Sequence, residues 1–169
     1  MAGSKRAGLI GPARLTSAHD TTRFDCERPA LNDWLKNRAL ESEGPTARTY
    51  VVCDDVVVGY YCIATGSVER KSLPSKMKRV QGQPNQIPVA IIGRLTRDKN
   101  YKGLGKDLLK DALERILHAS ETIGIRAVLV HAIDDEAAKF WREQEFIVCP
   151  DEPRTFFLAI DTIADAIGG

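Results

Sequence analysis

The stretch IIGRLTRDKNYKGLGKDLLKDALERI, residues 91–116, decides the fold of this chain. It continues an apolar run that predicts a strand over Val89–Thr96, and this run is apolar on both faces, as in a central strand. Gly103-Leu104-Gly105 predicts a turn, and apolar residues at i, i+3 and i+4 spacing predict a helix to about Thr122. With a further strand expected over Ile125–Ile133, the segment indicates one βαβ crossover whose two strands are parallel neighbours.

The sequence on either side of this crossover predicts antiparallel strands and short helices. Before it we expect a helix over Pro29–Glu43 that Gly44 and Pro45 end, a hairpin of strands Thr49–Cys53 and Val56–Val68, and a polar loop over 69–88 with room for a short helix. After it we expect closure of the long helix at Gly124, a helix from a cap at Asp134 through Gln144, a strand over Thr155–Ile160 and a helical tail over Asp161–Ile167. The order predicts an α+β domain with a mixed, mostly antiparallel sheet flanked by helices. Residues 1–14 are expected to form a loose basic tail, and residues 15–169 a single domain.

The composition is that of a globular protein and limits its partners. With 43% hydrophobic and 28% charged residues, the chain of 169 residues is no disordered protein. Its 24 basic and 23 acidic residues nearly cancel, which excludes a global polycation but not a local basic patch. The longest apolar run, 56–68, is shorter than the ~20 residues that span a bilayer. Because the N-terminus also lacks an apolar signal segment, we expect a cytoplasmic protein with no membrane partner.

The cysteines and histidines are too scattered to indicate a metal site or a disulfide framework. No CxxC pair occurs, and the three histidines lie far apart in the sequence. The four cysteines are interpreted as free structural thiols: Cys26, Cys53, Cys62 and Cys149.

The glycine turn before the long helix is a candidate anion site. Backbone N–H groups converge at a helix start, the helix dipole adds partial positive charge, and Lys102 and Lys106 flank the turn. The P-loop pattern fails, because Asn100 stands at its first glycine and Asp107 at its Ser/Thr position. The dinucleotide pattern fails as well, since Leu108 occupies its third glycine position. From the residues alone, a plain strand–helix turn and a phosphate site both remain open.

The whole stretch 91–116 resembles motif A of the GNAT superfamily of acyl-CoA-dependent acetyltransferases, in which a bulged strand is followed by (Gln/Arg)-x-x-Gly-x-(Gly/Ala) opening a helix. The resemblance implies the GNAT fold and acetyl-CoA as co-substrate. It implies that the strand amides of this motif hold the acetyl carbonyl and that the amides of the loop hold the pyrophosphate. The cofactor-binding residues carried over are Leu95, Thr96, Arg97, Lys102, Gly103, Leu104, Gly105 and Lys106.

Further segments resemble one GNAT branch, the tRNA-acetylating toxins of bacterial toxin–antitoxin pairs. They are Phe24-Asp25-Cys26, Leu31-Asn32-Asp33-Trp34-Leu35, Arg48-Thr49-Tyr50-Val51-Val52, Gly59-Tyr60-Tyr61, Gly93-Arg94-Leu95, Val130-His131-Ala132 and Ala138-Lys139-Phe140-Trp141, so the match covers roughly residues 15–160. This branch implies a toxin that acetylates the α-amino group of aminoacyl-tRNA and blocks translation. It also implies a cognate ribbon–helix–helix antitoxin, operator binding only through that antitoxin, and a homodimer.

Two features depart from this branch. The branch reads Gln-Gly-x-Gly-x-Gly, whereas Tyr101 is followed only by Lys102-Gly103-Leu104-Gly105, two residues fewer. The branch has Phe-Tyr where this chain has Phe140-Trp141, and that tyrosine is the general acid for the leaving thiolate. An indole N–H donates a hydrogen bond but does not release its proton. The resemblance therefore implies that Trp141 stands at the catalytic position. Three explanations for the missing general acid stay open: another donor or a water protonates the thiolate, positioning alone suffices, or the enzyme is weakened or inactive.

Basic residues give the nucleic-acid candidates. The loop after residue 69 carries Lys71, Lys76, Lys78 and Arg79, either as a solvated surface or as phosphate contacts for the acceptor arm of tRNA. Arg94, on the strand before the cofactor loop, is either a structural ion pair or a nucleic-acid contact, which the Gly-Arg-Leu resemblance implies. His131 is interpreted as a core histidine, and of Tyr60 and Tyr61 we expect one to face a cleft, since strand side chains alternate.

Two rival functions remain at this stage. One is a GNAT enzyme that acetylates a small amine or a protein N-terminus, for which the basic loop is dispensable. The other is a binding module that keeps the fold but has lost turnover, which the short loop and Trp141 both favour. A salt-sensitive tRNA complex with no measurable transfer would select the binding module, because phosphate contacts weaken as salt rises, and salt-independent transfer to free amines would select the small-amine enzyme.

Overall fold

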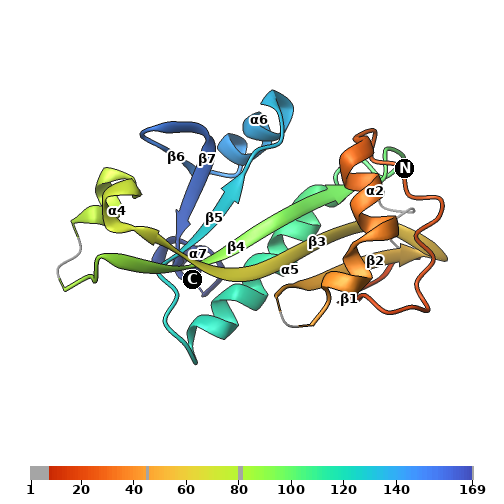
Figure 1. Ribbon diagram of the computed structural model, residues 1–169, viewed down its shortest axis with the longest axis horizontal. Coiled ribbons are helices and arrows are strands. Elements are labelled where there is room, and N and C mark those ends of the chain that lie inside the picture. Colours follow the sequence, from red (N-terminus) through yellow and green to blue (C-terminus); the bar gives the residue numbers. More distant parts are fainter. Residues whose placement is uncertain (1–7, 45, 80–81, 169) are drawn as a thin grey trace. The chain divides into compact units, whose positions relative to one another are not determined.

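The computed structural model describes residues 8–44, 46–79 and 82–168 (Figure 1). Its elements are β1 (Ile10–Arg14), α2 (Pro29–Asn37), α3 (Ala39–Ser42), β2 (Arg48–Asp54), β3 (Val56–Glu69), a 3-10 turn at Arg70–Ser72, α4 (Ser75–Lys78), β4 (Gln86–Arg97), α5 (Leu104–Ser120), β5 (Ala127–His131), α6 (Asp135–Glu143), β6 (Ile147–Cys149), β7 (Glu152–Ala159) and α7 (Ile160–Gly168). The chain divides into two compact units, 1–64 with 93–112 and 65–92 with 113–169. The single domain expected over residues 15–169 stays a prediction.

Among the residues that the structure describes, seven strands form a sheet in the order β1-β2-β3-β4-β5-β7-β6. β4 and β5 are parallel, in register from Val89 opposite Ala127 to Ile92 opposite Val130. The pairs β1–β2, β2–β3, β5–β7 and β6–β7 are antiparallel. This mixed, mostly antiparallel sheet with its parallel crossover confirms the predicted fold class.

The first unit is built around aromatic side chains of β3 and α2. Tyr60 is fully buried, meets Phe24 edge-on at 5.5 Å between ring centroids and stacks on Trp34 at 5.8 Å. Gly59 lets α5 approach β3 closely, because a Cβ there would lie 2.9 Å from Leu104 Cδ2. The start of α5 is therefore seated directly on β3.

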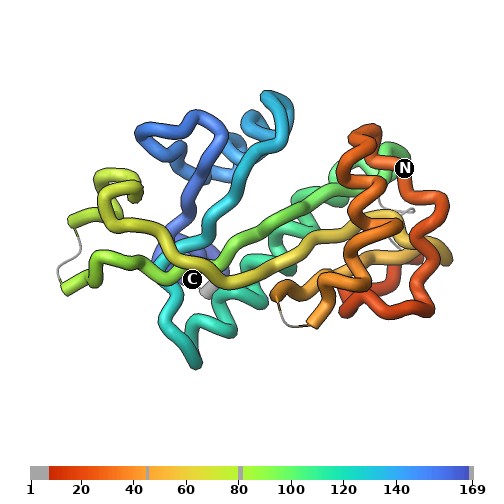
Figure 2. Tube along the Cα trace, viewed as in Figure 1, coloured from red at the N-terminus to blue at the C-terminus, as the bar shows by residue number. Residues whose placement is uncertain are grey.

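The second unit packs residues 65–69 of β3 and 86–92 of β4 with β5, β7 and α4. Its core gathers buried apolar side chains: Leu73, Met77, Ile87, Val89, Ala127, Leu129, Cys149 and Phe157. Figure 2 traces β5 and β7 side by side, in agreement with their register from Ala127 opposite Ala159 to His131 opposite Thr155. Every residue of β5 before His131 is buried, as expected for a strand paired on both sides.

The chain start differs from the sequence prediction. Residues 1–7 of the expected loose tail lie outside the described residues. Ile10–Arg14 is strand β1, which pairs with β2 through Ala13 opposite Val51. The register shifts between Ile10 and Ala13, where Gly11 has φ of +108°, so the segment lacks the regular alternation that marks a strand.

The predicted ends of several helices and strands were also wrong. The helix expected over 29–43 is broken at Arg38, whose φ of −124° is not helical, into α2 and α3. Pro45, one of its two expected stop residues, lies outside the described residues. α5 ends at Ser120, short of Gly124, while β4 starts three residues earlier than Val89, at Gln86. The last strand starts at Glu152 rather than Thr155, and the short edge strand β6 was not predicted.

Candidate functional site

The glycine loop ends where α5 begins. The helix starts at Leu104, so Leu104 and Gly105 belong to its first turn rather than to a preceding turn. Gly103 has φ of +88°, a conformation that a residue with a Cβ rarely adopts. The N–H groups of Gly103, Gly105 and Lys106 belong to the set that a helix start leaves without an i−4 carbonyl, while that of Leu104 donates to Tyr101 O at 3.2 Å.

These donors suit a phosphate group. Lys102 and Lys106 are exposed on either side of them and add two positive charges to the helix dipole. The predicted anion site thus has three available amides and two ammonium groups in one short segment. The loop is short, but its donor chemistry fits the pyrophosphate of acetyl-CoA.

The segment before the loop is fastened by a buried carboxylate. Asp98 is 7% exposed, and its side chain accepts from Asn100 N at 2.9 Å and from Asp25 N at 3.1 Å. The Asp98 amide donates to Val58 O at 2.7 Å. These bonds join the end of β4 to β3 and to the segment before α2. Donors held in this way need little reorganisation when an anion binds.

An exposed ion pair adds to this anchor. Lys99 Nζ lies 3.1 Å from Asp25 Oδ2, and Asn32 Nδ2 donates to Asp25 Oδ1 at 3.2 Å. The backbone hydrogen bond from Glu27, followed by those from Lys99 and Asn32, lowers the pKa of Asp25. The bond to Asp25 raises the pKa of Lys99. Two segments that resemble the toxin branch, Phe24-Asp25 and Leu31-Asn32, therefore help to fix the residues that precede the glycine loop.

The other cofactor candidates lie at the end of β4. Leu95 and Arg97 are half-buried and Thr96 is buried at 6% exposed, all within the strand that leads into the loop. Arg97 Nη1 donates to Asp98 O at 3.3 Å. The structure thus places all eight predicted cofactor residues on one continuous segment, from β4 to the first turn of α5.

Arg94 is held by an aromatic ring rather than by an ion pair. Its Cζ lies 4.1 Å from the centroid of the Trp34 ring, and Trp34 stacks on Tyr60 with an interplanar angle of 17°. Among the described residues, no carboxylate forms a salt bridge with Arg94. Burial raises the pKa of the neighbouring Cys62 thiol, and the Arg94 charge opposes that rise. A guanidinium stacked on a ring can still donate hydrogen bonds from its edge to an anion.

Trp141 lies in an aromatic cluster of the second unit. It is 5% exposed, with its ring 5.1 Å from Phe140 and 5.0 Å from Phe146 between centroids. α6 begins at a cap in which Asp134 Oδ1 accepts from Ala137 N at 2.8 Å, as predicted. The packing fits the interpretation of Trp141 as an aromatic filler, and its catalytic position stays a prediction.

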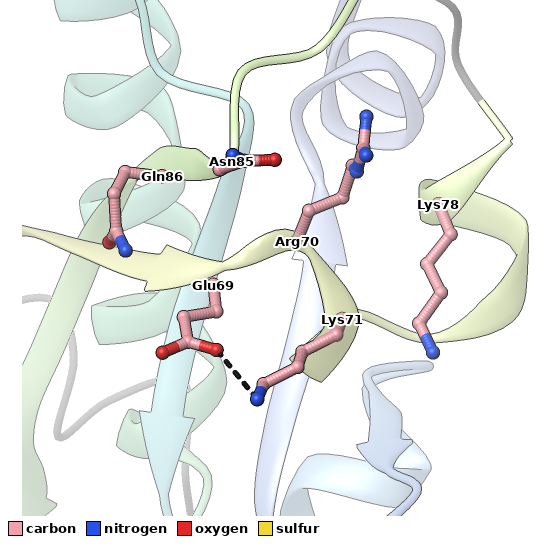
Figure 3. A pocket seen from close by; sticks show the side chains of 6 residues that line it. All are labelled: Glu69, Arg70, Lys71, Lys78, Asn85 and Gln86. Atoms are coloured by element: carbon pink, nitrogen blue, oxygen red, sulfur yellow. Dashed lines mark ion pairs between the residues drawn. The ribbon is translucent and has the colours of Figure 1, made fainter.

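The basic loop borders a hollow of about 430 Å³. It is lined by Glu69, Arg70, Lys71, Lys78, Asn85 and Gln86 (Figure 3). Lys71 Nζ pairs with Glu69 Oε2 at 3.1 Å, and Arg70 extends away from that pair and donates to Gln83 O at 3.2 Å. Two predicted nucleic-acid residues, Lys71 and Lys78, therefore share this hollow. Lys76 and Arg79 are exposed but are not among the residues that line it.

The structure corrects two other interpretations. His131 is exposed at the end of β5, so it is not a core histidine. Tyr60 and Tyr61 are both fully buried, and neither faces a cleft: Tyr60 Oη donates to Leu31 O at 2.8 Å and Tyr61 Oη to Asp111 Oδ2 at 2.5 Å. All four cysteines are free thiols, as predicted.

Residues 8–44, 46–79 and 82–168 include no group of three or more His, Cys, Asp or Glu placed to hold a metal ion. No helix in the same ranges is long and apolar enough to cross a membrane.

Comparisons with known proteins relate this fold to bacterial toxins. No family model matches the sequence. The chain is 37% identical over 166 residues to a tRNA-acetylating toxin of Mycobacterium tuberculosis, covering 96% of this chain and 99% of that protein. It is 32% identical over 163 residues to a probable toxin TacT of Sinorhizobium fredii, covering 89% and 90%.

Solved structures of toxins also resemble this fold. A tyrosine-to-phenylalanine mutant of KacT superimposes with a TM-score of 0.87 at 29% identity, covering 95% of this chain and 99% of that chain. AtaT complexed with acetyl-methionyl-tRNAfMet superimposes with a TM-score of 0.86 at 28% identity, covering 94% and 98%. The fold and the amide-rich start of α5 define a GNAT-fold acetyltransferase. This chain belongs to the family of tRNA-acetylating toxins, which confirms the resemblance seen in the sequence.

Proposed function

We propose that this chain transfers the acetyl group of acetyl-CoA to the α-amino group of an aminoacyl-tRNA and so blocks translation. The observation that carries the proposal is the braced helix start, with three amides and two lysines, in a member of the tRNA-acetylating toxin family. AtaT has been solved with acetyl-methionyl-tRNAfMet, the product that such a transfer would give, and AtaTR with acetyl-CoA, which supports the proposed reaction.

The chemistry needs little from the protein beyond positioning. A neutral amine attacks the thioester carbonyl, negative charge grows on the carbonyl oxygen, and a thiolate leaves. We propose that backbone amides of Leu95–Arg97 hold the acetyl carbonyl and that Lys102–Lys106 hold the pyrophosphate. Amides already fixed by the Asp98 anchor would stabilise that charge without rearranging.

Trp141 is proposed to take the position of the family's tyrosine. Solved mutants of KacT and AtaT carry phenylalanine in place of a tyrosine. An indole N–H can hydrogen-bond to the sulfur and orient it, but the thiolate then has to take its proton from another donor or from water. We expect a slower enzyme than a tyrosine-containing one.

The tRNA contacts are proposed at two places. Lys71, Lys76, Lys78 and Arg79 would bind phosphates, since all four are exposed and two border the hollow. Arg94 would bind an anionic group of the tRNA, since its guanidinium faces no carboxylate among the described residues. These contacts set affinity rather than chemistry.

The remaining partners follow from the relatives. AtaT has been solved with the C-terminus of its antitoxin AtaR, and KacTA with DNA. We propose a cognate ribbon–helix–helix antitoxin for this chain, with operator DNA bound only through that antitoxin. We also propose a homodimer that acts in the cytoplasm, where its tRNA substrate is charged.

One calorimetric titration followed by one assay tests the proposal. Acetyl-CoA is titrated into the full chain, and the same sample then receives a pool of charged tRNAs. Micromolar binding with acetylation of at least one aminoacyl-tRNA supports the proposal. Absence of binding rules out the enzyme, and binding without transfer favours the non-catalytic module that the short loop and Trp141 suggest.

Salt dependence separates tRNA from a small amine as substrate. The KM for tRNA should rise steeply with salt. The slope of log KM against log salt concentration should fall by about 0.7 to 0.9 for each phosphate contact removed. Replacing Lys71, Lys78 and Arg79 by alanine should lower that slope, whereas Lys36→Ala, an exposed lysine on α2, should not. A KM that is independent of salt would favour the small-amine enzyme.

A further inference from the structure

The hollow beside the basic loop is built from chain segments of the second unit alone. Its lining residues come from the end of β3, the 3-10 turn, α4 and the start of β4, all within residues 65–92. The Arg70 amide donates to Asn85 O at 2.9 Å, and Arg70 Nη1 donates to Gln83 O at 3.2 Å. These bonds join two of the walls. The volume of about 430 Å³ lies in the range of small-molecule sites, roughly 300–1,000 Å³.

The hollow carries more positive than negative charge. Three cations and one carboxylate line it, and the Glu69 carboxylate pairs with Lys71 at 3.1 Å. Among the described residues, neither Arg70 nor Lys78 forms a salt bridge. Figure 3 shows Arg70 and the Glu69–Lys71 pair pointing to opposite sides of the chain. Arg70 and Lys78 therefore keep their charges for an anion such as a phosphate group.

Two amide side chains add hydrogen-bonding groups to the same hollow. Within the described part of the chain, the Asn85 side chain makes no hydrogen bond. Gln86 Oε1 accepts from Ser67 Oγ at 3.2 Å, which leaves the Gln86 NH₂ group as a donor. The free amide of Asn85 presents one donor and one acceptor side by side. This pair matches the acceptor and the donor of adenine, whereas guanine presents two acceptors at the same edge.

The cations and the free amide together select one class of ligand. A positively charged amine would be repelled by the two cations, and a bare phosphate would leave the amides unused. A base inside an RNA helix is also excluded, because side chains cannot read the deep, narrow major groove of that helix. An unpaired nucleotide offers both a phosphate and an accessible base edge.

We infer that the hollow binds one unpaired adenine nucleotide of the tRNA substrate, with the base on Asn85 and the phosphate on Arg70 and Lys78. The inference rests on the proposed function and adds recognition of a base to the phosphate contacts proposed there. Phosphate contacts position a nucleic acid, while base contacts distinguish one sequence from another. The hollow thus selects among tRNAs and takes no part in the chemistry.

Binding of adenosine monophosphate tests the hollow without catalysis. The full chain is first saturated with coenzyme A, so that the nucleotide does not bind at the glycine loop instead. Adenosine monophosphate should then bind about tenfold more tightly than guanosine monophosphate, because a bidentate amide contact discriminates between bases by about 1–3 kcal/mol. Ribose 5-phosphate, which has no base, should bind no more tightly than guanosine monophosphate.

Two substitutions separate the base contact from the phosphate contact. Asn85→Ala should abolish the preference for adenine and leave the affinity for guanosine monophosphate unchanged. Lys78→Ala should weaken both nucleotides alike, because a phosphate contact carries no base information. Asn37→Ala is the matched control, since Asn37 is an exposed asparagine at the end of α2.

Acetylation kinetics carries the test to the substrate. In one acetylated tRNA, each unpaired adenosine except the one that carries the amino acid is replaced in turn by guanosine. One of these replacements should raise the KM of the wild type about tenfold with an unchanged kcat. The same replacement should leave the KM of Asn85→Ala unchanged, because loss of a base contact relaxes specificity at that position.

The outcomes distinguish the inference from the proposed function. An active wild type that binds the two monophosphates equally overturns the inference and leaves the proposed function intact. So does an Asn85→Ala variant that keeps the preference for adenine. A wild type that transfers no acetyl group to any charged tRNA overturns the proposed function, and with it the tRNA role of the hollow, whatever the preference between the monophosphates.

Discussion

The Tyr101 hydroxyl donates a 2.5 Å hydrogen bond to Asp54 Oδ2, which joins the residue before the glycine loop to the end of β2. Together with the Asp98 anchor, this bond holds the loop segment from two sides within the first unit. Neither partner belongs to the donor set that suits the pyrophosphate. The bond therefore supports the site by positioning, and its loss should be felt in affinity.

Tyr101→Phe should lower the free energy of unfolding by about 1 kcal/mol, because a partly exposed hydrogen bond to a carboxylate is lost. Acetyl-CoA should bind several-fold more weakly. Urea denaturation and calorimetry measure the two effects. Asp54→Asn serves as the second side of a double-mutant cycle, and fully additive effects of the two substitutions would contradict the contact.

The same bond predicts a pH dependence at the alkaline end. The hydrogen bond to Asp54, followed by desolvation, raises the pKa of Tyr101 to about 12. A raised pKa means that the folded state favours the neutral phenol, so the contribution is complete below the ordinary value of about 10. It should be lost as the pH rises through about 12. Unfolding curves of wild type and Tyr101→Phe should therefore converge over that window, and a constant difference would contradict the assignment.

Gly103→Ala should weaken acetyl-CoA binding and cost about 1–2 kcal/mol of stability, because the φ of +88° is strained for a residue with a Cβ. Gly124→Ala is the matched control, since a Cβ there meets no atom within 4 Å and its φ is ordinary. Thermal unfolding measures the loss of stability in both variants, and calorimetry measures their affinity for acetyl-CoA. Equal effects of the two substitutions would show that the glycine-loop conformation has no special importance.

The sequence predicted what is local or periodic. The βαβ crossover, the hairpin and the Asp134 cap were all predicted, because each depends on spacing within a few residues or on a long apolar pattern. β1 and β6 were not predicted, and the reasons are physical. Both are short edge strands, and a glycine with positive φ interrupts β1.

The contacts that shape the candidate site are non-local and left no sequence pattern. Tyr101 meets Asp54, and Arg94 meets Trp34, across long separations in the chain. His131 was assigned to the core because its strand is apolar, yet it ends that strand and faces outward. The cross-strand pairing with Thr155 becomes visible only once the β5–β7 register is known.

Trp34→Leu should raise the KM for charged tRNA by about three- to tenfold and leave the KM for acetyl-CoA unchanged. The reason is that the stacked ring holds the Arg94 guanidinium, and such cation–π contacts are worth about 0.5–2 kcal/mol. Steady-state kinetics with each substrate varied in turn measures both constants. Trp34→Phe keeps an aromatic face and should lie between leucine and wild type. An unchanged KM for tRNA would mean that Arg94 does not depend on Trp34.

Trp141→Tyr should raise kcat, because a phenol can give its proton to the leaving thiolate and an indole cannot. A gain of about tenfold or more is expected where protonation limits the rate, with little change in the KM for acetyl-CoA. Rapid-mixing kinetics on acetyl transfer should show the gain in the chemical step rather than in product release.

Trp141→Phe separates chemistry from packing. It has nearly the size of tyrosine, and like tyrosine it leaves space beside Phe140 and Phe146, but it donates no hydrogen bond. If both variants lose stability equally and only tyrosine gains rate, the position is a functioning acid site that tryptophan fills poorly. If tyrosine gains nothing, the thiolate leaves without help from this position, and Trp141 serves only the aromatic cluster of the second unit.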